Sequence, residues 1–328
     1  MKHGLVIGKF APFHRGHQFL VETALAECGE VTVVVYDWPE YRIPLRKRAR
    51  WIRSLYPGVE VLEAADSPQC TGDTPEIKAL HESFLKGVLG ARRITHFYSS
   101  EFYGEHISRA LGAVDRRVDT ARKAYPVSGT AVRSNPGAYR DFVSPLVYRD
   151  LVVKAVFMGS VSTGKSTIVR ELARRHGTSF MPEYGAEYWS AHQVDRRLTR
   201  EELEAIAIEH LRREESAINR ANGACFIDTN AISTYMFSLD YHGAATPGLE
   251  RLADACRDRY DLFFLCKDDI PYEDTPDRSG DVKRHDFQRR IEEDLARRGI
   301  ACVPLFGGLE TRIARVDEVL DDFNKQIK

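Results

Sequence analysis

The stretch that decides the fold of this chain is GKFAPFHRGH, residues 8–17. An apolar run at residues 5–7 precedes it, and a helix-like segment at residues 18–28 follows it. This order predicts a strand, a tight turn and a helix N-terminus, with His14 and His17 held at the turn. Because a helix N-terminus offers unpaired N–H groups and the positive end of a dipole, the turn is suited to a phosphate. Two imidazoles add hydrogen-bond donors for charge that develops on a transferring phosphate.

Bulk composition narrows the class of protein. A chain of 328 residues exceeds the usual size of a single core, so we expect two domains. Lys and Arg number 47 against 48 Asp and Glu, and this balance predicts no general attraction to nucleic acid or to a membrane. The six cysteines form no CxxC pair, which disfavours metal clusters and disulfide frameworks. Without a signal peptide or a long apolar run, the sequence predicts a soluble, cytoplasmic protein.

Strand-like and helix-like segments alternate through both halves of the chain. The strands expected in the first half are 5–8, 31–36, 59–63, 95–99 and 116–119, and the helices are 18–28, 45–55, 75–89 and 103–111. The strands expected in the second half are 152–158, 178–180, 224–227, 262–266 and 301–305, and the helices are 165–176, 200–221, 249–257, 285–298 and 311–324. Alternation of this kind predicts an α/β protein with two doubly wound parallel-sheet domains, 1–148 and 149–328.

The opening motif resembles that of the HxGH nucleotidyltransferases, and a second signature of that superfamily, VSGTAVR, stands at residues 127–133. A lone histidine is more often structural than catalytic, but two signatures in the correct order outweigh that reading. The resemblance covers residues 1–145 and implies a Rossmann-like domain. It implies that His14 and His17 contact the phosphates of ATP, while Thr130 and Arg133 hold the leaving pyrophosphate. The other residues expected to bind this ATP are Gly8, Lys9, Phe10, Gly16 and Ser128.

The acceptor of the adenylyl group is suggested by the segment YSSEFYG, residues 98–104. It resembles the corresponding segment of nicotinamide mononucleotide adenylyltransferases, especially those fused to a kinase, and it nominates Ser99, Ser100 and Glu101 as acceptor-binding residues.

Two more acceptor-binding residues come from aromatic and basic side chains. Trp38 can stack on a nicotinamide ring because aromatic faces attract flat cationic rings, although ordinary partial burial has equal weight. The basic cluster at residues 42–53 is expected to be mostly a solvated face, with Arg46 as the exception that meets the acceptor's phosphate.

A second phosphate site is predicted by GSVSTGKS, residues 159–166, which fits GxxxxGK[ST] directly after an apolar strand. In such a loop the backbone N–H groups cradle phosphates, Lys165 reaches the outer phosphate oxygens and Ser166 binds Mg²⁺. The other loop residues expected to bind ATP are Gly159, Ser162, Thr163, Gly164 and Thr167.

Residues beyond the loop indicate what kind of P-loop protein this is. Glu183 is placed like the carboxylate of deoxynucleoside-kinase-like enzymes that takes a proton from a substrate hydroxyl. Asp228, at a strand end, has a Walker-B-like position for Mg²⁺. The segment 269–278 resembles the lid loop of the same kinases, so Arg278 and Arg284 are expected to close over the transferring phosphate. A GTPase is disfavoured because no NKxD-type segment is visible.

The order of the two domains resembles the NadR family of bifunctional NAD salvage enzymes over nearly the whole chain. The resemblance implies a kinase that makes nicotinamide mononucleotide from ribosylnicotinamide and an adenylyltransferase that converts the mononucleotide to NAD, both using Mg²⁺ and ATP. Some members carry an N-terminal helix-turn-helix repressor domain. Here the first strand starts at residue 5, so the form without it, which binds no DNA, is expected. The family's segment matching residues 182–188 is richer in arginine than PEYGAEY.

Two alternatives stay open at this stage. One is phosphopantetheine adenylyltransferase fused to dephospho-coenzyme A kinase, which uses the same two superfamilies. The other is an adenylyltransferase whose P-loop domain senses ATP without transferring phosphate. The sequence does not separate the amide from the acid form of the pyridine substrate. A homo-oligomer is an expectation from enzymes of this kind rather than from any residue.

Overall fold

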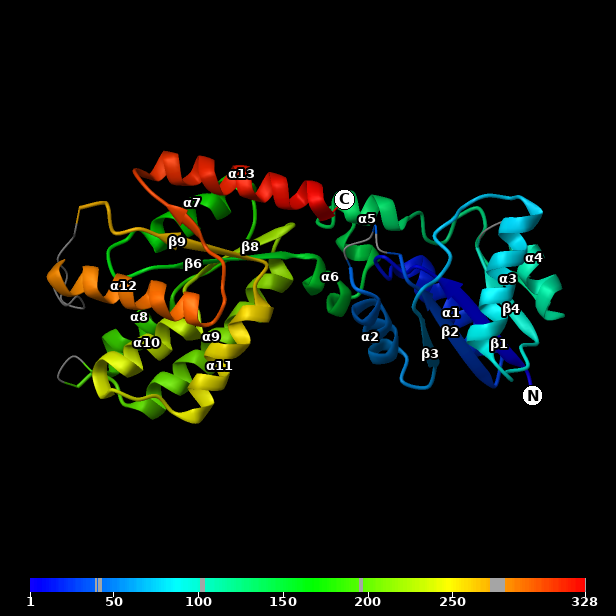
Figure 1. Ribbon diagram of the computed structural model, residues 1–328, viewed down its shortest axis with the longest axis horizontal. Helices are drawn as coiled ribbons and strands as arrows, with labels where there is room; N and C mark the ends of the chain where they lie inside the picture. The colour runs from blue at the N-terminus through cyan, green and yellow to red at the C-terminus, as the bar shows by residue number, and fades with distance from the viewer. Residues whose placement is uncertain (39, 41–42, 101–103, 195–196, 272–280, 328) are drawn as a thin grey trace. The chain divides into compact units, whose positions relative to one another are not determined.

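The computed structural model describes the chain except residues 39, 41–42, 101–103, 195–196, 272–280 and 328 (Figure 1). Two compact units divide the chain, one formed mainly by Met1–Tyr148 and the other by Arg149–Asn324. Within the described residues each unit is built on a five-stranded sheet whose strands are all parallel. The predicted fold class, two doubly wound α/β domains, is therefore confirmed.

In the first unit the strand order is β3-β2-β1-β4-β5. The strands are β1 His3–Gly8, β2 Glu30–Tyr36, β3 Glu60–Ala64, β4 His96–Ser99 and β5 Val114–Arg117. The helices are α1 Arg15–Glu27, α2 Leu45–Leu55, α3 Pro75–Leu89, α4 Gly104–Leu111 and α5 Gly129–Ser134, with a 3₁₀ turn at Arg140–Phe142. Helix α6, Pro145–Leu151, begins in this unit and ends in the second. The order reverses between β1 and β4, so the crevice beyond their carboxyl ends is where a ligand is expected in this architecture.

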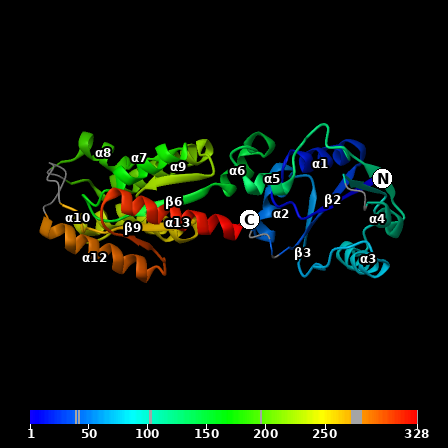
Figure 2. The same cartoon turned by 90° about the horizontal axis from the view of Figure 1, so that it is seen from above.

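Helices cover both faces of this sheet. Leu85 of α3 and Ile107 of α4 pack with Leu5, Val34 and Phe97 in one buried cluster. Helix α1 contacts the strands from the other side, and Figure 2 shows α1 and α3 on opposite sides of the strands. The central strand β1 is thereby fixed on both faces, and the motif that follows it starts from a rigid base.

In the second unit the strand order is β10-β9-β6-β8-β7. The strands are β6 Val153–Met158, β7 Phe180–Met181, β8 Ala224–Asp228, β9 Leu262–Cys266 and β10 Val303–Leu305. The helices are α7 Lys165–His176, α8 Tyr184–His192, α9 Arg200–Arg220, α10 Ala231–His242, α11 Pro247–Arg259, α12 Asp281–Arg297 and α13 Leu309–Ile327.

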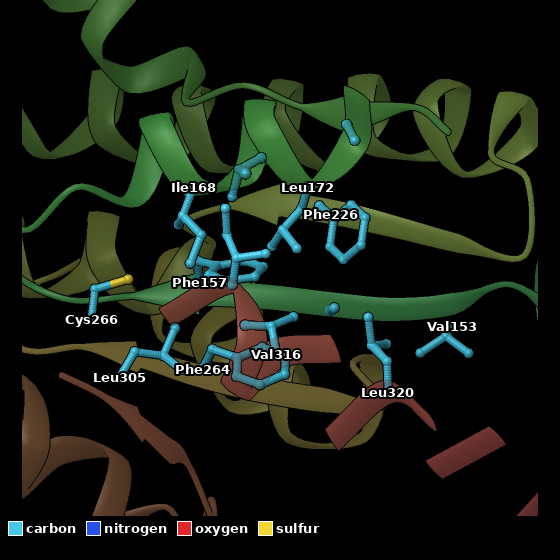
Figure 3. Packing of buried hydrophobic residues seen from close by; sticks show 14 residues of the cluster. Val153, Phe157, Ile168, Leu172, Phe226, Phe264, Cys266, Leu305, Val316 and Leu320 are labelled. Carbon is cyan, nitrogen blue, oxygen red and sulfur yellow. The ribbon is translucent and has the colours of Figure 1, made fainter. Parts of the chain in front are cut away.

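The core of the second unit is apolar and lies between its central strands and two helices. Phe157, Phe226 and Phe264 of neighbouring strands meet Leu172 of α7 and Val316 of α13 (Figure 3). The Phe157 and Phe264 rings stack with centroids 5.1 Å apart. Every residue of β6 is buried, as expected for a central strand of a parallel sheet covered on both faces. This buried strand carries the loop 159–166 at its carboxyl end.

Most predicted elements exist, but helices α6, α8 and α10 were not expected. In α10 the buried residues are spread around the helix, so no apolar stripe of helical period marks it in the sequence. Helix α8 has no buried residue and lacks such a stripe for the opposite reason. The predicted strand 178–180 is shifted to Phe180–Met181. Among the described residues, no helix is long and apolar enough to cross a membrane.

Candidate active sites

The turn after β1 brings the two histidines together. His14 is the N-cap of α1, and its backbone N–H donates to Nδ1 of His17 at 3.3 Å. The two rings stack with centroids 3.6 Å apart and an interplanar angle of 19°. His17 also meets the rings of Phe10 and Phe13, with centroids 5.0 and 5.9 Å away. Aromatic packing therefore holds both imidazoles at the start of the helix.

Burial keeps these imidazoles neutral. It lowers the pKa of His14 to about 4 and the pKa of His17 well below its ordinary value. The positive charge of Arg122 lowers the pKa of both further, and His14 adds to the effect on His17. At neutral pH each ring therefore carries one N–H and no charge. Each neutral ring retains one N–H that can donate a hydrogen bond to a phosphate oxygen.

Glycines let the motif pack this tightly. A Cβ on Gly8 would lie 2.9 Å from the Phe10 ring, and one on Gly16 would lie 3.2 Å from the His14 ring. A Cβ on Gly129 would lie 3.0 Å from the carbonyl oxygen of Ala11. The two signatures thus approach each other at backbone distance.

The second signature forms the start of α5. Ser128 is the N-cap, and its hydroxyl accepts the Ala131 N–H at 3.1 Å. Arg133 donates through Nη1 to the carbonyl of Ala11 and through Nη2 to Oγ1 of Thr130 at 3.3 Å. Arg133 therefore links the two motifs while its guanidinium borders the space between them.

That space is a cavity of about 710 Å³. It is lined by the following residues that the sequence nominated: Gly8, Lys9, Phe10, His14, Gly16, His17, Trp38, Ser99, Ser100, Ser128, Thr130 and Arg133. A volume of this size suits a nucleotide-sized ligand. The described part of its lining does not include Arg46, which is exposed on α2, so the structure does not bring Arg46 to the acceptor as expected. Glu101 lies outside the described residues.

The indole ring of Trp38 makes a cation–π contact with the ammonium of Lys9. The Lys9 ammonium stands 3.1 Å from the ring centroid, and the indole N–H donates to Glu40 at 3.0 Å. Burial lowers the pKa of Lys9; the charge of Glu40 opposes this and that of Arg133 adds to it. Trp38 is buried, at 7% exposed, and it forms part of the cavity wall; its stacking on a nicotinamide ring stays a prediction.

One arginine of the basic cluster is fully buried, although a solvated face was expected for most of them. Arg48 donates to the carbonyls of Lys9 at 2.5 Å and Tyr36 at 2.7 Å, and it pairs with Asp37 at 3.2 Å. Its position on the same face of α2 as the buried Trp51 was the available signal. Arg48 thus fixes the backbone at the start of the HxGH motif.

Some residues of the cavity wall were missed by sequence reasoning. They are Cys70, His81, His106, Asp119 and Arg122. They lie outside the two signatures. Cys70, Asp119 and Arg122 are on connections between elements, whereas His81 and His106 are on α3 and α4.

In the second unit the loop 159–166 joins β6 to α7. Three of its residues have left-handed or otherwise positive φ: Gly159 at 142°, Ser162 at 58° and Gly164 at 80°. A Cβ on Gly159 would lie 2.6 Å from the carbonyl oxygen of Cys266, so only glycine fits there. The hydroxyl of Thr163 and Nζ of Lys165 both donate to the carbonyl of Ser160 at 2.8 Å.

Asp228 is the last residue of β8 and lies beside this loop. It is 1% exposed, and Oδ1 has no hydrogen-bond partner within the described part of the chain. Burial raises the pKa of its carboxyl, while the charge of Lys165 and a hydrogen bond with Ser166 lower it. A buried carboxylate oxygen next to a serine hydroxyl fits a Mg²⁺ whose other ligands are phosphates and water. In keeping with so few protein ligands, the described residues contain no cluster of three or more His, Cys, Asp or Glu side chains able to hold a metal.

The remaining expected kinase residues have different positions. Ser166 and Thr167 are exposed in the first turn of α7. Glu183 is the half-buried N-cap of α8, directly after β7. Arg284 is 1% exposed and donates to the carbonyl of Ile270 at 2.9 Å, and its expected contact with the transferring phosphate stays a prediction. Arg278 lies outside the described residues.

Arg312 of α13 supports the phosphate loop and was not anticipated. It is 3% exposed and donates to the carbonyls of Thr163 at 2.7 Å and Lys267 at 2.9 Å. It also pairs with Asp269 at 2.5 Å. An arginine far along the chain, within a charged helix, carries no sequence pattern that predicts this role.

Taken together, the fold and the two sites define a class: an enzyme with a nucleotidyltransferase-like unit followed by a P-loop unit. Comparison with protein families agrees, because residues 5–135 match the cytidylyltransferase-like family and residues 154–312 match the AAA domain family. The chain is similar to the NadR proteins.

This similarity is found in relatives whose sequences align with nearly the whole chain. It is 28% identical over 324 residues to the trifunctional NAD biosynthesis/regulator protein NadR of Salmonella typhimurium strain LT2, and 27% identical to that of Escherichia coli strain K12. Each alignment covers 92% of this chain and 78% of the relative.

Solved structures of NadR proteins are also similar to this chain. The crystal structure of a NadR protein in complex with NR is 25% identical with a TM-score of 0.63, and covers 98% of this chain and 96% of that one. A NadR protein in complex with NAD and AMP-PNP is 25% identical with a TM-score of 0.62, covering 99% and 96%.

Proposed function

We propose that this protein is a bifunctional enzyme of NAD salvage. Its P-loop domain, 149–328, phosphorylates ribosylnicotinamide with ATP to give nicotinamide mononucleotide. Its first domain, 1–148, transfers an adenylyl group from a second ATP to that mononucleotide, giving NAD and pyrophosphate. The observation that carries the proposal is the neutral His14–His17 pair facing one nucleotide-sized cavity with Arg133. NAD biosynthesis in the NadR relatives, and NR, NAD and AMP-PNP in the NadR structures, support the choice of substrates.

In adenylyl transfer, an oxygen of the acceptor's phosphate attacks the α-phosphorus of ATP. The bond from that phosphorus to the bridging oxygen breaks, and pyrophosphate leaves with the electron pair. No covalent nucleophile is needed, so the protein's task is alignment and charge stabilisation. His14 and His17 donate hydrogen bonds at the start of α1, while Thr130 and Arg133 hold the pyrophosphate. Lys9 is a further contact for the phosphates.

The acceptor occupies the part of the cavity bordered by Trp38, Ser99 and Ser100. Ser99 is 5% exposed, and a Cβ on Gly104 would lie 2.2 Å from its hydroxyl, so α4 starts tightly against it. This close packing fixes a hydroxyl at the carboxyl end of β4, next to β1. Trp38 offers an aromatic surface for the pyridinium ring once the ring replaces Lys9 there.

In phosphoryl transfer, the loop 159–166 cradles the phosphates and Lys165 neutralises their outer oxygens. Asp228 and Ser166 would hold Mg²⁺, which supplies charge neutralisation between the phosphates. Glu183 takes the proton of the substrate hydroxyl. The six cysteines are free thiols, which suits the cytosol as the site of this reaction.

The test is a chromatographic product assay with Mg-ATP and either ribosylnicotinamide or nicotinamide mononucleotide. NAD from both substrates is expected. NAD from the mononucleotide alone would leave the P-loop domain as a sensor or as a kinase for another substrate. No NAD from either would turn attention to phosphopantetheine and dephospho-coenzyme A.

A further inference from the structure

The connection between β5 and α5 contains a turn held by its own carboxylate. Asp119 accepts hydrogen bonds from the backbone N–H groups of Lys123 at 2.7 Å, Ala124 at 3.2 Å and Tyr125 at 3.2 Å. The N–H of Arg122 donates to the Asp119 carbonyl at 2.8 Å. Asp119 and Arg122 both have left-handed backbones, with φ of 49° and 50°. Left-handed non-glycine residues persist where surrounding bonds enforce them, and they are frequent at ligand sites.

The same turn is attached to the helix that carries the histidines. The ring of Tyr125 packs on Phe19 of α1, with centroids 5.5 Å apart. The hydrogen-bonded carboxylate of Asp119 at one end and the Tyr125 ring at the other therefore fix the backbone at Arg122.

This rigid turn presents Arg122 to the cavity of the HxGH motif. Arg122 is exposed and lines that cavity together with His14, His17 and Arg133. Its positive charge also lowers the pKa of both His14 and His17. Lys123, its neighbour in sequence, is also exposed but is not among the residues of the described cavity wall.

The proposed reaction in this cavity requires positive charge near the leaving group. Adenylyl transfer breaks a phosphorus–oxygen bond and leaves the electron pair on pyrophosphate, so negative charge grows on the leaving group. Both histidines are neutral, and Lys9 and Arg133 are the cations of the two motifs that stand in the described cavity wall. An arginine binds phosphate through two parallel N–H···O bonds, which is stronger and better oriented than a contact from an ammonium.

We propose that Arg122 is a phosphate-binding residue of the adenylyl transfer site that holds the part of ATP leaving as pyrophosphate. The inference rests on the proposed adenylyl transfer in the first domain. It adds a residue from the β5–α5 turn to the two signatures that flank the cavity.

The experiment compares Arg122→Gln and Arg122→Lys with the matched control Lys123→Gln. NAD formation from nicotinamide mononucleotide is measured, as is the reverse reaction from NAD and pyrophosphate. For Arg122→Gln we expect KM for ATP and for pyrophosphate to rise about tenfold or more, the effect of losing one charge-assisted contact. KM for the mononucleotide and phosphorylation of ribosylnicotinamide stay unchanged. Lys123→Gln behaves as wild type, and Arg122→Lys recovers part of the loss.

A pH profile separates binding from a merely structural role. His14 and His17 face each other and Arg122, and Lys9, Asp119 and Arg133 line the same cavity. Removing the Arg122 charge raises the pKa of both histidines, so the acid limb of kcat/KM moves to higher pH in Arg122→Gln. It stays in place in Arg122→Lys, which retains the charge. Unchanged KM values for ATP and pyrophosphate in Arg122→Gln would overturn the inference.

Calorimetry keeps this inference distinct from the proposed function. A non-hydrolysable ATP analogue is expected to fill two sites in the wild-type protein, and Arg122→Gln weakens one of them. If the wild type makes no NAD but Arg122→Gln still weakens one site, the proposed reaction fails and the phosphate contact stands. Equal isotherms for the two proteins would contradict the contact itself.

Discussion

The two proposed phosphate sites of this chain must both stabilise negative charge on ATP, and they use different groups to do so. The site of the first unit uses buried neutral imidazoles with arginines around a preformed cavity. The site of the second unit uses a loop with positive φ values, a lysine and a buried acid, Asp228. The first site is therefore proposed to depend on specific side chains at the turn after β1, whereas the second is proposed to depend on backbone N–H groups and a bound Mg²⁺. The comparison shows why loss of one site is expected to leave the other intact.

The largest expected effect comes from removing a member of the histidine pair. His17→Ala removes a donor that is held by stacking and by the His14 N–H, so adenylyl transfer should fall by about 10²–10³-fold. Phosphorylation of ribosylnicotinamide should be unaffected. Rates of NAD and mononucleotide formation are measured separately, with Arg46→Ala as the control because Arg46 is exposed on α2. Wild-type NAD formation from the mononucleotide by His17→Ala would refute the assignment of this site.

An effect of similar kind, restricted to the other unit, is expected from Lys165→Ala. The variant removes the ammonium that reaches the phosphates from α7, so riboside phosphorylation should fall by about 10²-fold or more. NAD formation from nicotinamide mononucleotide should remain at the wild-type rate. Arg174→Ala is the control, because Arg174 lies on the same helix, pairs with Glu171 and is exposed. Normal riboside phosphorylation by Lys165→Ala would give the loop another task.

The neutral histidines make stability depend on pH. The pKa of His14 is about 4 in the folded protein against 6.5 in its ordinary state. Because the pKa of His14 is lower in the folded protein, its contribution to the free energy of unfolding is fully present above pH 6.5. That contribution is lost as the pH falls toward about 4. The loss attributable to His14 is about 3 kcal/mol. Chemical denaturation of wild type and His14→Gln at pH 7 and pH 4.5 measures it, and an equal loss in both would contradict the buried neutral imidazole.

The smallest effect is expected at the acceptor end of the cavity. Trp38→Leu keeps an apolar side chain but removes the aromatic face over which Lys9 stands, so KM for nicotinamide mononucleotide should rise about threefold to tenfold. KM for ATP should change less than twofold. Steady-state kinetics with each substrate varied in turn checks both values. An increase confined to ATP would place the pyridinium ring elsewhere.

Much of this structure was predictable because two motifs and hydrophobic alternation are local. The HxGH turn and the loop 159–166 each follow an apolar strand. Each motif therefore lies at the carboxyl end of the central strand of its own sheet, where a ligand is expected in this architecture. Helix α10 was not predictable because its buried residues are spread around it and leave no stripe.

The supporting arginines show the limit most clearly. Arg48 belonged to a cluster expected to be mostly solvated, Arg284 was expected over the transferring phosphate, and Arg312 was not singled out. Each is buried on backbone carbonyls. The carbonyls that Arg312 satisfies belong to residues distant in sequence, such as Thr163, so their need for a donor is visible only after folding. Arg46 shows the converse, since a helical face of positive charge did not bring it to the cavity.

The measurement that tests the central claim most directly is complementation between two variants supplied with ribosylnicotinamide and Mg-ATP. His17→Ala alone should accumulate nicotinamide mononucleotide, and Lys165→Ala alone should form product about 10²-fold or more slowly than wild type. A mixture of the two should make NAD much faster than either variant alone, because each variant retains one complete site and the mononucleotide passes through solution. NAD formation at the wild-type rate by Lys165→Ala alone, or no gain in the mixture, would contradict the division of the two reactions between the two units.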